Sequence, residues 1–94
     1  MALARVVTFE GVDRNRMDEL DREMQQGDPP EGLSPTELVV LHDANANTSM
    51  VLVFFDNEDD YARGDEILNA MPAGDTPGQR TGVTKYDVVT RMTP

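Results

Sequence analysis

The chain has no cysteine and no tryptophan, a single histidine, and fewer than half as many basic as acidic residues. Without cysteine, neither a disulfide nor a thiolate metal site can support the fold, so stability must come from packing and association. His42 has no second imidazole and no acidic cluster of fixed spacing beside it, so no metal site and no cofactor are expected. No apolar run approaches membrane-spanning length, and residues 1–5 lack a signal-peptide pattern. The sequence therefore predicts a cytoplasmic protein.

The acidic excess limits the partners that this chain can bind. Eighteen Asp and Glu residues against eight Lys and Arg residues give a formal net charge of −10. Such a charge repels phosphate backbones and anionic lipid surfaces, so neither a nucleic acid nor a membrane is an expected partner. Most acidic residues fall in segments that we expect to be helices or loops, which favours a solvated surface over a cation-binding one.

A length of 94 residues predicts one domain with one core, residues 1–94. Periodicity and turn-forming residues predict six regular elements in the order strand, helix, strand, strand, helix, strand. The first helix is capped by Asp13 and ends near Gln26, and the second is capped by Asp56 or Asn57 and ends before Pro72. The strands are expected at residues 5–10, 37–42, 49–55 and 85–92, with turn-rich loops at 27–35 and 73–84.

This order predicts an α+β fold, a ferredoxin-like βαββαβ antiparallel sheet with both helices on one face. If the other face were solvated, the strands would alternate strictly between apolar and polar residues. Residues 38–41 and 50–55 are apolar throughout instead. Because burying each large apolar side chain is worth about 1.5 to 3 kcal/mol, we expect something to cover the second face. A second copy of the chain is the natural candidate, which predicts a homodimer through the open sheet face.

Residues 53–61, Val-Phe-Phe-Asp-Asn-Glu-Asp-Asp-Tyr, run from an apolar strand through a short acidic link into a helix. With the other elements, they make nearly the whole chain resemble the dimeric α/β-barrel superfamily, which contains the antibiotic-biosynthesis-monooxygenase-type domains. The resemblance implies the dimeric barrel fold more strongly than any activity, since the superfamily includes cofactor-free oxygenases, haem-degrading enzymes and isomerases. Its oxidative members tend to use tryptophan, asparagine and histidine, and this chain has no tryptophan, so no catalytic residue is carried over.

Five residues are candidates for a ligand site between the helices and the sheet: His42, Tyr61, Tyr86, Phe54 and Arg5. Histidine is the residue type best suited to proton transfer near neutral pH, and His42 ends a predicted strand, so it is a candidate general base or ligand contact, although a structural role is more common at such a position. Tyr61 lies on the apolar stripe of the second helix, where core packing is the favoured interpretation, and Tyr86 is expected in a similar position. Arg5 could hold an anionic group, but an ion pair with a neighbouring carboxylate is more common.

Three functions remain open from the sequence. The first is a homodimeric domain that binds a small apolar or aromatic molecule between helices and sheet. The second is a cofactor-independent monooxygenase-like enzyme acting on an aromatic polyketide-like compound, with His42 and Tyr61 in proton transfer. The third is a dimerisation module without a ligand.

The methionines at positions 17, 24, 50 and 71 are expected to line the core or the pocket.

Overall fold

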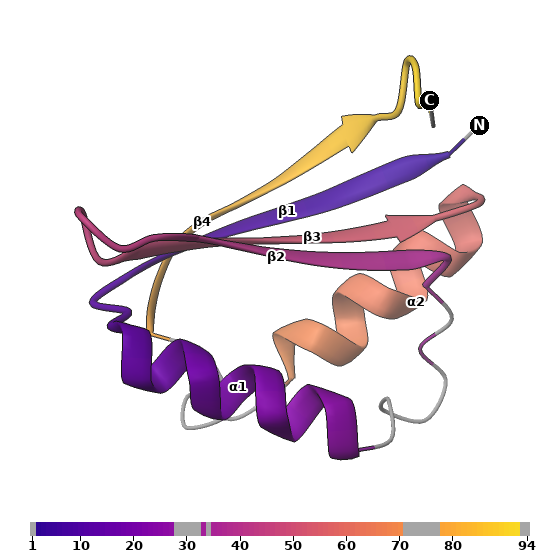
Figure 1. The fold of residues 1–94 in the computed structure, drawn as a ribbon. Helices are drawn as coiled ribbons and strands as arrows, with labels where there is room; N and C mark the ends of the chain where they lie inside the picture. The colour runs from indigo at the N-terminus through magenta and orange to yellow at the C-terminus, as the bar shows by residue number, and fades with distance from the viewer. Residues whose placement is uncertain (1, 28–32, 34, 71–77, 93–94) are drawn as a thin grey trace.

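A computed structural model describes residues 2–27, 33, 35–70 and 78–92. Its elements, in chain order, are β1 (Leu3–Glu10), α1 (Arg14–Gln26), β2 (Glu37–Asp43), β3 (Thr48–Phe55), α2 (Glu58–Asn69) and β4 (Gln79–Asp87). The strands form one antiparallel sheet in the order β2-β3-β1-β4. Both helices lie on the same side of this sheet (Figure 1). The arrangement is α+β and is compatible with a ferredoxin-like fold.

The helices begin where the sequence predicts caps. The Asp13 side chain accepts a hydrogen bond of 2.8 Å from the backbone N–H of Arg16, which satisfies one free donor in the first turn of α1. Of the two candidates for α2, the cap is Asn57, whose side-chain oxygen accepts from the N–H of Asp60 at 2.8 Å. Three acidic residues in the first turn of α2 also suit the helix dipole.

Two apolar clusters join the sheet to the helices. Under α2 the buried residues are Leu3, Val53, Phe55 and Tyr61. Beside the start of α1 the buried residues are Val7, Phe9 and Val12, with Met17 packed against them. The strand residues in both clusters have odd numbers on β1 and β3, because alternate side chains point to the same face of a sheet. The odd-numbered face therefore carries the core of the subunit.

β4 differs from the strand predicted at residues 85–92. It covers Gln79–Asp87, so the predicted loop at 73–84 is wrong over its last six residues. Pairing with β1 explains the shift, because Asp87 lies opposite Leu3, the first residue of β1. Beyond it a single bond remains, from the N–H of Val88 to the carbonyl of Ala2 at 2.9 Å. The apolar pair Val88-Val89 favours a strand, but the strand ends because its partner ends.

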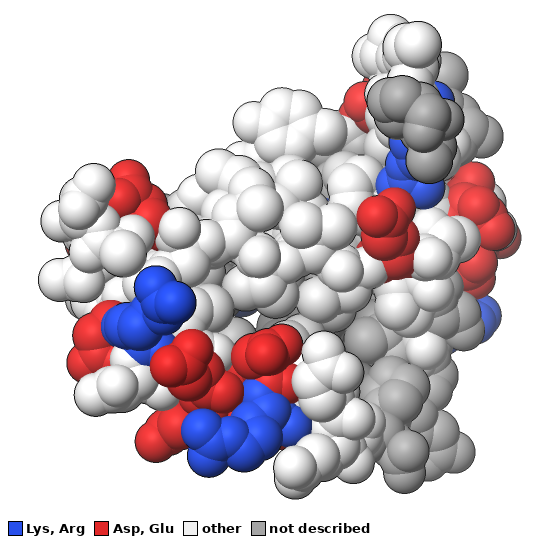
Figure 2. Space-filling model, in the orientation of Figure 1, with Lys and Arg blue, Asp and Glu red and all other residues white. Residues whose placement is uncertain are grey.

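Neither of the two described helices lies over the second face of the sheet (Figure 1). Three of its large apolar side chains are exposed: Leu41 by 50%, Met50 by 37% and Tyr86 by 53%. The charged residues on this face, Glu10, Glu37 and Asp43, all lie at strand ends. Figure 2 shows charged side chains over α1 and at both ends of the sheet, with an uncharged expanse between them. We call this second face of the sheet, which includes Glu10, Glu37, Leu41, Asp43, Met50 and Tyr86, the open face.

Some predictions fall outside the described residues, namely Met71 and the parts of the two turn-rich segments at residues 28–32, 34 and 73–77. Among the helices that the structure does describe, none is both long enough and apolar enough to cross a membrane.

Candidate functional site

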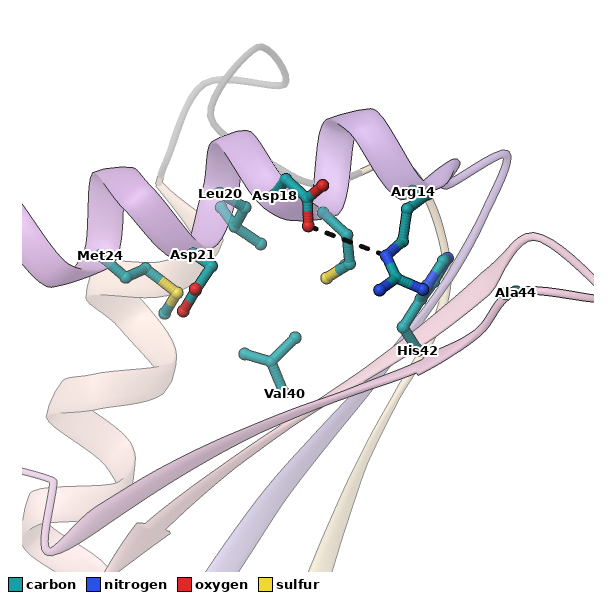
Figure 3. A pocket seen from close by; sticks show the side chains of 9 residues that line it. Arg14, Asp18, Leu20, Asp21, Met24, Val40, His42 and Ala44 are labelled. Carbon is teal, nitrogen blue, oxygen red and sulfur yellow. Dashed lines mark ion pairs between the residues drawn. The ribbon is translucent and has the colours of Figure 1, made fainter.

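A cavity of about 340 Å³ lies between α1 and β2, on the helix side of the sheet (Figure 3). Its apolar walls come from Met17, Leu20 and Met24 on the helix and Val40 on the strand. The helix residues are three and four positions apart, so they share one face of α1. Figure 3 shows Val40 pointing from β2 into the space below these side chains. The stripe that the sequence predicts as core therefore also forms one wall of the cavity.

His42 borders the same cavity, two residues along β2 from Val40 and on the same face of the strand. Its Nε2 lies 2.8 Å from the backbone carbonyl oxygen of Val12. Because a carbonyl only accepts, Nε2 must carry the proton, which leaves the Nδ1 of a neutral ring as an acceptor. Of the five candidates, His42 is the one that lines this cavity.

The bond from His42 also completes the hydrogen bonding of Val12, which is fully buried. The N–H of Val12 donates to the backbone carbonyl of Asn47 at 2.8 Å. Asn47 has a φ of +54°, in the left-handed region that asparagine tolerates in tight turns. The β2–β3 hairpin therefore provides hydrogen-bond partners for both the N–H and the carbonyl of Val12, which lies between β1 and α1.

The rim of the cavity is charged. Arg14, Asp18 and Asp21 on α1 complete its lining with Ala44 from the hairpin. The Nε of Arg14 and a carboxylate oxygen of Asp18 are 3.9 Å apart, and both side chains are more than half exposed, so the pair is loose. These rim residues were not among the predicted site residues, although their positions beside the apolar stripe of α1 could have identified them. The site thus combines an apolar interior with two carboxylates, one guanidinium and one imidazole.

Tyr61 lies elsewhere, in the cluster under α2. Its ring packs edge-on against Phe55 with centroids 5.7 Å apart, and the ammonium of Lys85 lies 5.0 Å from the Tyr61 centroid. Burial, and secondarily the nearby Asp65 carboxylate, raises the pKa of Tyr61 above its ordinary value. Tyr61 does not line the cavity next to His42, so the structure does not bring together the two residues proposed for proton transfer.

Arg5 forms the ion pair that the sequence favours. Its Nε donates to a carboxylate oxygen of Asp65 at 2.8 Å, and its second guanidinium nitrogen donates to the side-chain oxygen of Asn69 at 2.9 Å. Arg80 donates to that same oxygen at 2.9 Å. Both arginines thus lie at the C-terminal end of α2, where positive charge offsets the helix dipole.

Tyr86 and Phe54 were expected on the helix side, and this expectation is wrong. Both are register partners of Ala4, so they lie on the open face, opposite the cavity. The guanidinium carbon of Arg91 lies 4.4 Å from the centroid of the Phe54 ring, and Arg91 also pairs with Glu37 at 3.1 Å. The alternation along the strands decides the face, and apolar composition alone does not reveal it.

No group of three or more His, Asp or Glu side chains is arranged to hold a metal ion within the part of the chain that the structure describes. Comparison with protein-family models, with curated proteins and with solved structures found no significant match to this chain.

Proposed function

We propose that this chain is a homodimeric, ferredoxin-like (βαββαβ) α/β-barrel domain that binds a small apolar or aromatic molecule between α1 and β2. The observation that carries the proposal is the cavity itself, which has apolar walls and a few polar groups at its edge. Small-molecule sites commonly have this composition.

The size of the cavity limits its ligand. Ligand pockets commonly measure about 300 to 1,000 Å³, and a cavity of about 150 Å³ can hold benzene. A volume of about 340 Å³ is therefore suited to a molecule of one or two rings. Such a molecule would lie against Met17, Leu20, Met24 and Val40, with His42 able to hydrogen-bond its polar group.

The open face supports the homodimer. The middle of this face is apolar, because Val6, Leu52 and Val39 are register partners there, and its carboxylates lie at the strand ends. An apolar centre with a polar rim is the usual composition of a protein interface. A second copy on this face would leave the cavity accessible, because the cavity lies on the opposite side of the sheet.

Two adjacent valines provide a sharp test of the ligand site. Val40 points into the cavity and Val39 lies on the open face. A neutral naphthalene-based fluorescent probe is titrated into the native protein, Val40→Phe and Val39→Phe. We expect Val40→Phe to weaken probe binding at least tenfold by filling the cavity, and Val39→Phe to retain it. Equal binding by all three proteins would disprove the site, and native mass spectrometry of the purified protein would detect a ligand that is already bound.

One observation favours the enzyme as a second candidate. His42 lies at the cavity with Nδ1 available as a proton acceptor, the role that a cofactor-independent monooxygenase-like enzyme acting on an aromatic polyketide-like substrate needs. Tyr61 would have no part in it. Turnover of an aromatic test substrate that is unchanged in His42→Ala would eliminate this candidate. If the native protein is a dimer but binds neither the probe nor the substrate, the remaining candidate is the third one, a dimerisation module that has no ligand.

A further inference from the structure

We infer that residues 88–92, which we call the C-terminal arm, fill a hollow on the open face of a second copy of this chain. The arm of the second copy fills the same hollow on the first. The inference rests on the homodimer proposed above. It goes further by naming the two parts of the surface that meet and the symmetry that relates them.

The arm follows β4 and is anchored on the open face of its own subunit. The first bond joins the N–H of Val88 to the carbonyl of Ala2. The second contact comes from Arg91, whose guanidinium lies over Phe54 on β3 and pairs with Glu37 on β2. Since β4 and β2 are opposite edges of the sheet, Arg91 holds the arm above the sheet instead of beside it.

Although its backbone is anchored, the arm exposes its apolar side chains. Val89 is 92% exposed and Met92 is 82% exposed, so both make almost no contact with their own subunit. An arm that served only to cover its own sheet would turn these side chains inward. Their exposure indicates that the surface they contact belongs to another molecule.

The opposite end of the open face has a hollow. A depression of about 470 Å³ lies next to the β2–β3 hairpin, and its lining includes Thr8, Leu41, Met50 and Thr81. The carboxylates of Glu10 and Asp43 also line it, at the ends of β1 and β2. Thr8 lies opposite Met50 in the sheet, Met50 lies opposite Leu41, and the hydroxyls of Thr8 and Thr81 are 2.7 Å apart, so the four share the open face. Figure 1 shows the arm and this hairpin at opposite ends of the sheet, with the arm on the side away from the helices.

A projection at one end and a hollow at the other are complementary under a twofold rotation. In an isologous dimer, whatever one copy contributes at one end, its partner contributes at the other. Stacking two open faces with their strands antiparallel would place each arm over the partner's hollow. The two apolar side chains of the arm would then meet Leu41 and Met50.

The area of the face also favours participation of the arm. Four strands spaced about 4.8 Å apart, with about eight residues rising about 3.3 Å each, cover roughly 500 Å². A stable interface commonly buries about 800 Å² on each partner. The accessible surface of the sheet exceeds this projected area, and the arm would add further apolar area from Val89 and Met92.

Disulfide trapping tests the contact directly, because the chain has no cysteine of its own. We expect Met92→Cys/Leu41→Cys to form a covalent dimer under mild oxidation. Within one subunit we expect no such disulfide. Leu41 is four residues, about 13 Å, along β2 from Glu37, the residue with which Arg91 of the arm pairs, and a disulfide needs Cα atoms within about 7 Å. The control, Met92→Cys/Arg63→Cys, pairs the arm with an exposed position on the helix side and should stay monomeric on a non-reducing gel.

Charge insertion gives a second readout. Val89→Asp and Met92→Asp should each raise the dimer dissociation constant about 100-fold, because each lost apolar contact occurs twice in the dimer. Ala62→Asp, on the exposed surface of α2, adds the same charge and should change the constant little. Sedimentation velocity measures all three, and circular dichroism should be unchanged because these side chains are already exposed.

The outcomes separate this inference from the proposed function. A dimer that resists both Asp substitutions and is not trapped by the cysteine pair would overturn the role of the arm and leave the homodimer intact. A native protein that is monomeric at high concentration would overturn both, while binding of the probe to the α1–β2 cavity would still be tested independently.

Discussion

The Nε of Arg5 lies 2.8 Å from a carboxylate oxygen of Asp65, although Arg5 is only 4% exposed. Replacing Asp65 by Asn would leave a nearly buried guanidinium without its counter-charge. Since Asp65 is itself 37% exposed, solvent compensates in part, and we expect a loss of about 1 to 3 kcal/mol in the free energy of unfolding.

Urea denaturation measures this loss. Asp18→Asn is the matched control, because Asp18 pairs loosely with an exposed arginine at 3.9 Å and should contribute less than about 0.5 kcal/mol. The double change Arg5→Met/Asp65→Leu should restore part of the stability, because it removes both charges together. A double variant less stable than Asp65→Asn would contradict this account.

Gly64 lies where α2 crosses Phe55, and a Cβ there would be about 2.6 Å from the Cε1 atom of the ring. In a solvent-exposed helix, Ala in place of Gly would add about 1 kcal/mol of stability. Here we expect the opposite sign, a loss of about 1 to 3 kcal/mol by overpacking. Thermal unfolding of Gly64→Ala measures this, and adding Phe55→Leu should recover some of the loss. A more stable Gly64→Ala would mean that the two elements can separate at little cost.

The raised pKa of Tyr61 predicts a dependence of stability on alkaline pH. Burial favours the neutral phenol of Tyr61 in the folded state, so the folded protein binds the phenol proton more tightly than the unfolded chain does. This contribution is present below the unfolded pKa of about 10 and is lost as the pH rises through the higher folded value. We expect native stability to fall above about pH 10. Tyr61→Phe should flatten that decline, as followed by urea denaturation across the pH range, and an identical decline in both proteins would exclude Tyr61 as its cause.

His42 is the only histidine in the chain, so its ring nitrogens can be assigned by nitrogen NMR without ambiguity. The bond to Val12 predicts the tautomer protonated at Nε2 when the ring is neutral. His42→Ala would leave the buried carbonyl of Val12 unpaired at a cost of about 1 to 3 kcal/mol. His42→Gln, which retains a donor, should lose less. An Nδ1 tautomer in the native protein would contradict the bond.

Local signals in the sequence were enough to predict both helices and three of the strands. Asp13 and Asn57 cap helices because their side chains reach the first-turn N–H groups, which depends only on neighbouring residues. The bounds of β4 depend on where β1 begins, a relation between distant segments that residues 85–92 do not carry. Composition alone therefore misplaced the last strand.

The candidate site was predicted in part for the same reason. The apolar stripe of α1 and the position of His42 at the end of β2 could be read locally, and both border the cavity. The sheet faces on which Tyr86 and Phe54 lie could not be predicted from the local sequence, because the register of the sheet determines them. A displacement of one residue would move either side chain to the other face.

The two bonds of Val12 have a mechanical consequence for the cavity. They fix the start of α1 to the hairpin, through Asn47 on one side and His42 on the other. An outward swing of α1 that keeps both bonds would pivot near Val12, and the displacement would grow toward Met24, twelve residues away along the chain. The helix itself spans about 15 Å from Arg14 to Met24. A ligand that enters by moving α1 would pass between Met24 and Val40. The end of the cavity next to His42 would not move.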